Sequence, residues 1–152
     1  MSPETRNPQK PFNFFPALLI SFAILILWLI PDLIILLHGG KGGPGVWGLF
    51  TFVAIPATVI VPLAYGWYTK DTTGAVLIGL LPFLLTMIIV RLWPGSSVED
   101  TSYLIKSVLY IGSLCVVGGL EGYFAAMHEK RSLVLAAAFA GLWALVFLSG
   151  IN

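Results

Sequence analysis

The sequence predicts an all-α membrane protein, a single domain built as a bundle of five transmembrane helices. Of its 152 residues, 58% are apolar and only 10% are charged, and the mean hydropathy is +0.95. Soluble domains carry about 25% charged residues, so this chain has too few charged residues to form the polar surface of a water-soluble domain. About 20 apolar residues in a helix cross a hydrocarbon layer of about 30 Å. Five runs approach that length: Pro16–Leu37, Val46–Tyr68, Gly74–Leu92, Tyr103–Met127 and Leu133–Gly150.

The first run is predicted to be a retained helix and not a cleaved signal peptide. Its apolar length exceeds the roughly 7–15 residues of a secretory core, and no small-residue cleavage pattern follows it. Asp32 comes directly after Pro31, and a proline leaves the carbonyl one turn earlier unpaired. Three interpretations of Asp32 stay open: a cation or proton site beside a broken helix, a partner for Arg91 or Lys106, or a group that reaches the lipid headgroups.

Prolines also interrupt the second run. Pro56 and Pro62 lie among three hydroxyl-bearing residues, Thr51, Thr58 and Tyr65, which recur every seven residues. Hydroxyl groups in membrane helices often bond the carbonyls that a proline leaves unpaired. We therefore expect a bent helix whose hydroxyls satisfy these carbonyls.

Turn signals separate the runs. The stretches 69–74 and 128–132 allow only tight turns, so the helices on either side of each are predicted to be antiparallel neighbours. The Pro-Gly pair at 94–95 ends the third helix, and the Ser-x-x-Asp pattern at 97–100 resembles a capping box ahead of the fourth.

The fourth run carries the strongest candidate for a functional site. Glu121 lies at membrane depth, about six residues from the inner end, where a charge is costly. At about 100° per residue, Tyr110, Glu121 and His128 fall close to one line on the helix, together with Tyr103 and Ser107. This polar stripe is either a water-filled path in which Glu121 and His128 carry protons, or the buried seam of the helix bundle.

Small residues mark the predicted helix-packing faces. Gly118 and Gly122, four residues apart in the fourth run, allow another backbone to approach closely. Ala136, Ala140 and Ala144 form a similar stripe in the fifth run. Both motifs join helices either within one chain or between chains. Because the fifth run has no charged or strongly polar group in its interior, it suits a position that faces lipid or another subunit.

Basic residues near the helix ends predict that the N-terminus is inside and the C-terminus outside. Lysine and arginine favour the inner side of a membrane. The predicted outer side holds Lys41, Arg91 and Lys106, and the predicted inner side holds Arg6, Lys10, Lys70, Lys130 and Arg131.

The sequence lacks the patterns of common enzymes and cofactor sites. No second histidine completes a zinc-protease motif after His128-Glu129, and there is neither a nucleophile elbow nor a Walker loop. Cys115 is the only cysteine, which excludes an intramolecular disulfide and a cysteine-pair metal site. The glycines at 40, 42 and 45 match a dinucleotide-binding pattern, but they connect two membrane helices where that site needs a strand. We expect no cofactor, no metal and no nucleic-acid partner.

Three classes of function remain open. The first is a non-catalytic subunit of a homo-oligomer or larger complex in the lipid bilayer of the cell membrane, supported by the small-residue faces and short loops. The second is a small transporter or channel for a proton, ion or small solute, with Glu121 and Asp32 as ionisable sites. An enzyme that acts on lipid comes third, since no nucleophile–base pair is evident, and we expect a protein that is not an enzyme.

Overall fold

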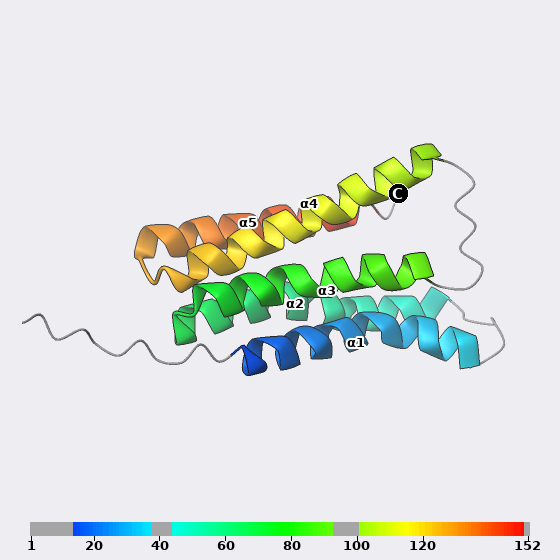
Figure 1. The fold of residues 1–152 in the computed structure, drawn as a ribbon, viewed down its shortest axis with the longest axis horizontal. Helices are drawn as coiled ribbons and strands as arrows, with labels where there is room; N and C mark the ends of the chain where they lie inside the picture. Colours follow the sequence, from blue (N-terminus) through cyan, green and yellow to red (C-terminus); the bar gives the residue numbers. More distant parts are fainter. Residues whose placement is uncertain (1–13, 38–43, 93–100, 151–152) are drawn as a thin grey trace, which may run out of the picture.

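The computed structural model describes residues 14–37, 44–92 and 101–150. Its elements are five helices that are long and apolar enough to cross a membrane, so the predicted all-α membrane bundle is confirmed. Each helix begins and ends within three residues of the predicted run. The helices are α1 (Phe15–Leu37), α2 (Pro44–Thr69), α3 (Thr72–Leu92), α4 (Thr101–Ala126) and α5 (Lys130–Ser149) (Figure 1).

Some predictions are not addressed by this fold. The side of the membrane on which each terminus lies stays a prediction, as does the assignment of the whole chain to one domain. The glycine loop before α2, the Pro-Gly pair at 94–95 and the capping pattern at 97–100 involve residues that lie outside the described ones.

The predicted tight turns join α2 to α3 and α4 to α5, and each pair is antiparallel, as expected (Figure 1). In the first turn, Lys70 has a positive φ of 57°, and its N–H donates to the carbonyl of Gly66 at 2.9 Å. Asp71 then starts α3, because its carboxylate accepts the N–H of Gly74 at 3.0 Å and the hydroxyl of Tyr65 at 3.1 Å. This end of the bundle, which holds both turns, is called the turn end below.

Removing the carboxylate of Asp71 tests this turn. Asp71→Ala leaves the Gly74 N–H and the Tyr65 hydroxyl without their acceptor, so we expect a loss of about 1 kcal/mol in unfolding free energy. Unfolding of the detergent-solubilised protein measures it. Asp71→Asn is the matched control, since its amide oxygen still accepts a hydrogen bond, and equal stability of the Ala and Asn variants would contradict this role.

The second turn has the same design but starts its helix earlier than predicted. His128 also has a φ of 57°. Ser132 accepts a hydrogen bond from the backbone N–H of Glu129 at 3.1 Å and donates one to the Glu129 carbonyl at 2.8 Å. Because this bonding supports the first turn, α5 begins at Lys130 and takes in two charged residues that the apolar pattern had left in the loop.

The hydroxyl groups of α2 do not act as the proline pattern suggested. Thr58 donates to the carbonyl of Ala54 at 2.7 Å, whereas Pro56 and Pro62 deprive the carbonyls of residues 52 and 58 of their helical partners. Tyr65 bonds to Asp71 in the turn. The expectation is therefore wrong for these two hydroxyls, because each finds a better-placed acceptor.

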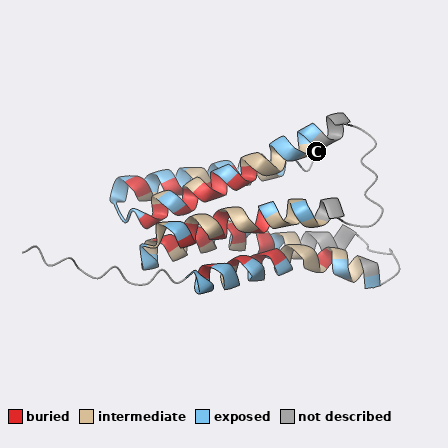
Figure 2. Cartoon of the chain, viewed as in Figure 1, coloured by how far each residue is buried: buried red, intermediate tan, exposed pale blue. Residues whose placement is uncertain are grey.

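The helices pack most closely at the turn end. α1, α2 and α3 are mutual neighbours, and the α4–α5 hairpin packs against α2 and, through α4, against α3. Figure 1 shows α4 diverging from α3 as the two helices run away from the turn end. Burial follows this divergence: α4 has no buried residue from Ile105 to Ser113 but many from Leu114 onward (Figure 2).

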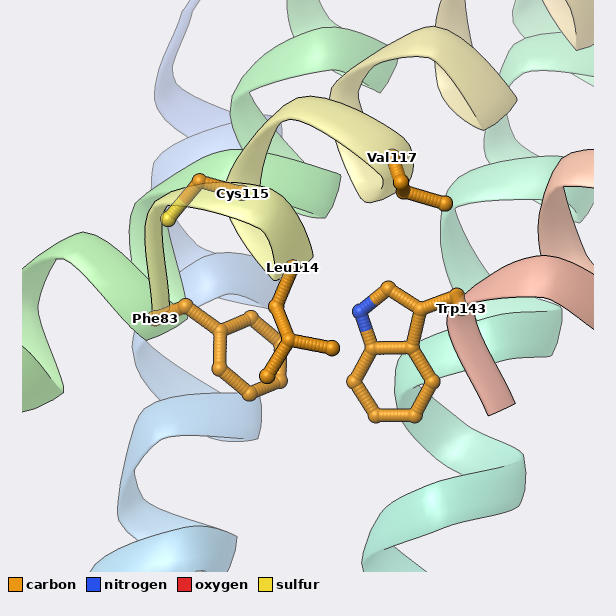
Figure 3. Packing of buried hydrophobic residues seen from close by; sticks show 5 residues of the cluster. All are labelled: Phe83, Leu114, Cys115, Val117 and Trp143. Carbon is orange, nitrogen blue, oxygen red and sulfur yellow. The ribbon is translucent and has the colours of Figure 1, made fainter. Parts of the chain in front are cut away.

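Aromatic side chains fill the middle of the bundle. Phe83, Leu114, Cys115, Val117 and Trp143 form one buried cluster from α3, α4 and α5 (Figure 3). The Trp143 ring lies 5.3 Å from that of Phe83 and 5.3 Å from that of Phe147. Trp28 of α1 joins the same group, with its ring 5.1 Å from Phe147. These rings connect the α4–α5 hairpin to the other three helices.

Candidate functional site

Glu121 lies inside the bundle, closed off from its surroundings. The side chain is 0% exposed, and neither carboxyl oxygen has a hydrogen-bond partner. The other buried polar residues of the described chain are Ser21, Thr58 and Ser132, all uncharged. Buried polar groups in proteins are normally paired, so an unpartnered carboxyl marks this place as a candidate site.

Two glycines allow this enclosure. Gly118 and Gly122 lie within one turn of Glu121 on α4, on the side that α3 covers. A Cβ added at Gly118 would lie 2.6 Å from the carbonyl oxygen of Gly79, and one at Gly122 would overlap the carbonyl of Ala75. Since no side chain holds the backbones apart, α3 lies directly against α4 on both sides of the carboxyl.

α2 completes the enclosure on another side. A Cβ at Gly66 would lie 3.0 Å from the Gly122 carbonyl oxygen, and the carbonyl of Trp67 lies 3.1 Å from the Nδ1 of His128. These contacts place α2 and α4 in parallel register, with Glu121 near the level of Pro62. Pro62 is itself fully buried, so α2 carries an apolar ring inside the bundle at this level.

α5 covers the remaining side with small residues and one tryptophan. Its buried residues are Ser132, Ala136, Ala140 and Trp143. Trp143 is 1% exposed, and its indole Nε1 has no hydrogen-bond partner. Figure 3 shows this nitrogen on the ring edge turned toward α4, next to Leu114 and Val117. Val117 and Glu121 lie one turn apart on the same face of α4.

Trp143 carries a buried polar group that the sequence patterns do not single out. The interior of the fifth run contains no charged or strongly polar side chain, yet a buried tryptophan carries an N–H that usually finds a partner. Its position in the sequence could have indicated its burial. Trp143 lies deep within its run, whereas Trp67 lies near the end of one, where tryptophans favour the membrane interface.

Tyr110 and His128 share the line of Glu121 in sequence, but the structure gives both of them other partners. The Tyr110 hydroxyl donates to the carbonyl of Phe147 at 3.0 Å and thereby joins α4 to α5. The ring of His128 lies 4.1 Å from that of Trp67, at the exposed turn end. The contact of Nδ1 with the Trp67 carbonyl requires a proton on that nitrogen. Both side chains stabilise helix pairs, which favours the seam interpretation for them.

The fold does not place Asp32 in the same site as Glu121. It is half-buried in α1, and α1 packs against α2 and α3 without being a backbone neighbour of α4. Within the described chain, no ion pair joins Asp32 to Lys106, whose side chain is exposed. The side chain of Arg91 lies outside the described residues. The proposed pairing with Arg91 therefore stays a prediction.

The small-residue motifs face helices of the same chain. Gly118 and Gly122 lie against α3, and Ala136 and Ala140 are buried within the bundle. Ala144 is partly buried against the aromatic cluster. Of the two alternatives for these motifs, packing within one chain is the one that the structure contains.

An enclosed carboxyl of this kind has two stable states. Burying an isolated charge costs far more than burying a neutral group, unless an opposite charge compensates it. Glu121 is therefore stable with a bound proton or beside a bound cation.

Fold and site together define a multi-pass helical membrane protein with an acidic side chain enclosed in its bundle. No family model, curated protein or solved structure matches the chain. Its function must therefore be argued from the site.

Proposed function

We propose that this protein is a small membrane transporter that moves a proton or a monovalent cation, with Glu121 as the binding group. The observation that carries the proposal is the complete burial of Glu121 with both carboxyl oxygens unpartnered. Ionisable residues at membrane depth are rare and costly, and they commonly mark ion and proton pathways.

The shape of the bundle supports this choice. The helices lie tightly together at the turn end, around Gly79 and Gly118. Toward the opposite end α4 diverges from α3, and a Cβ at Gly112 would meet no atom within 4 Å. A transporter needs a binding group that is shielded from both sides in at least one state, and Glu121 lies between the aromatic cluster and the turn end.

The hypothesis that the protein is a non-catalytic subunit of a homo-oligomer or larger complex has less support after the helix packing is taken into account. It depended on small-residue faces, and those faces are occupied by helices of the same chain. Self-association, membership of a larger complex and location in the cell membrane stay predictions. The expectation that the protein is not an enzyme also stays a prediction.

Ion flux into liposomes tests the proposal. Purified protein is reconstituted into liposomes that contain a dye selective for H⁺, Na⁺ or K⁺, and a gradient of that same ion is imposed. The membrane potential is clamped with an ionophore that does not carry the measured ion. We expect the wild type to move at least one of these ions, and Glu121→Gln to reduce that flux at least ten-fold, because the amide takes up neither a proton nor a cation.

Asp32→Asn is the matched control, since it removes a second membrane-depth carboxylate that has no place in the enclosed site. We expect its flux to stay within about two-fold of the wild type. Wild-type liposomes that move none of the three ions would overturn the proposal, as would equal flux in wild type and Glu121→Gln.

A further inference from the structure

The polar groups that the neighbouring helices carry at the level of Glu121 bear on which positive species this carboxyl can bind. The Thr58 hydroxyl of α2 already donates to Ala54 and accepts the indole N–H of Trp28 at 3.0 Å. α3 presents Ala75 and Gly79 beside the neighbouring glycines of α4. Neither helix brings a charged side chain to this level within the described chain.

Trp143 supplies the remaining polar group. Its ring packs in one cluster with Val117, and Val117 lies one helical turn, about 6 Å along the axis, from Glu121. Helical side chains lean toward the N-terminus of their own helix. Because α4 and α5 are antiparallel, this general tendency directs side chains at these two positions toward each other. The Glu121 carboxyl and the Trp143 Nε1 are thus two buried, unpartnered polar groups on the facing sides of α4 and α5, with no hydrogen bond between them in this structure.

The chemistry of this pair differs from that of a metal-cation site. Hard cations are held by several oxygen ligands, whereas an indole presents only an N–H, the positive end of its dipole. In the described chain, no group of three His, Cys, Asp or Glu side chains is placed to hold a metal ion. An N–H donor repels a cation but stabilises a carboxylate that has lost its proton.

We propose that the site between α4 and α5 is selective for protons, with Glu121 carrying the proton and the Trp143 N–H donating a hydrogen bond to the carboxylate once the proton has left. The inference depends on the proposed transport function and narrows its substrate. Only the carboxyl O–H bond forms and breaks: Glu121 takes its proton from water on one side of the membrane and releases it to water on the other, and the indole keeps its own proton throughout.

The liposome assay separates this inference from the transport proposal. We expect a Glu121-dependent proton flux, and Na⁺ and K⁺ fluxes equal to those of Glu121→Gln. A Glu121-dependent Na⁺ or K⁺ flux would overturn proton selectivity while leaving transport at Glu121 intact. Absence of all three fluxes would overturn the transport proposal itself.

Substitutions at Trp143 test the role of the N–H. Trp143→Phe removes the donor, and Trp143→benzothienylalanine replaces the N–H by sulfur while keeping the ring volume. We expect both variants to slow proton flux about ten-fold or more, since a hydrogen bond to a charged group is lost. The sulfur variant keeps the packing of the cluster, so its flux loss is not due to misfolding.

Trp28→Phe is the matched control for a lost indole in the same aromatic cluster, since its N–H bonds Thr58 and not Glu121. We expect its flux to stay near that of the wild type. Infrared difference spectra that compare each variant with Glu121→Gln report the carboxyl band of Glu121 directly. That band should shift on Trp143→benzothienylalanine and stay in place on Trp28→Phe. Wild-type flux and an unshifted band in the sulfur variant would overturn the role of Trp143.

Discussion

Leucine at Gly118 is expected to disrupt the bundle. A single Cβ at this position would already lie 2.6 Å from the Gly79 carbonyl oxygen and 3.3 Å from its carbon, and both are backbone atoms that no rotamer change can move. Overpacking in a tight interior costs about 1–3 kcal/mol, so we expect a loss of that size for Gly118→Ala and a larger loss for Gly118→Leu. Unfolding of the protein in detergent micelles measures both.

Two other helical glycines provide the control. Cβ atoms at Gly112 of α4 and Gly141 of α5 would meet nothing within 4 Å. Leucine at either place should therefore change stability by no more than about 0.5 kcal/mol. If Gly118→Leu instead left stability unchanged and shifted a solubilised oligomer to monomer, Gly118 would join subunits, and the packing described here would be contradicted.

Methionine at Glu121 is expected to stabilise the protein while abolishing ion flux. A buried polar group without a partner costs about 1–3 kcal/mol. Methionine has a similar length and a flexible apolar chain that adapts to its surroundings. We therefore expect Glu121→Met to raise the unfolding free energy by about that amount. Active sites often carry residues that function needs and stability disfavours.

The comparison of variants separates a functional carboxyl from a structural one. Glu121→Gln keeps the shape and a polar group, so its gain in stability should be smaller than that of Glu121→Met. A methionine variant less stable than the wild type by about 1 kcal/mol or more would mean that the carboxyl makes stabilising bonds in the fold. That outcome would remove the argument for Glu121 as an ion-binding group.

Much of the fold follows from one-dimensional patterns. Run length and composition predicted five helices, and each observed end lies within three residues of its run. The start of α5 differs most, because the bonding between Ser132 and the Glu129 backbone extends the helix over two charged residues. Glu121 was also predictable as a candidate, because a charge at membrane depth is unfavourable whatever its neighbours are.

The residues that lie together with Glu121 could not be predicted from the sequence in the same way. Tyr110 and His128 lie on the line of Glu121 along α4, but Phe147 of α5 and Trp67 of α2 provide their partners. A helical wheel gives the direction of a side chain and not the helix that meets it. Glu121 was singled out because a charged side chain at membrane depth is costly. Trp143 carries no charge, so this criterion does not identify it.

By itself, the sequence determined the class of protein, the approximate extent of each helix, and Glu121 and Asp32 as the acids at membrane depth. These depend on hydrophobicity and charge, which each segment carries regardless of its neighbours. Only the tertiary structure decided that the glycines of α4 face α3, that Glu121 is closed off and that the Trp143 N–H is buried without a partner. Those features depend on the register between helices, and here the register follows from the close backbone approach of Gly79 to Gly118, far apart in the chain.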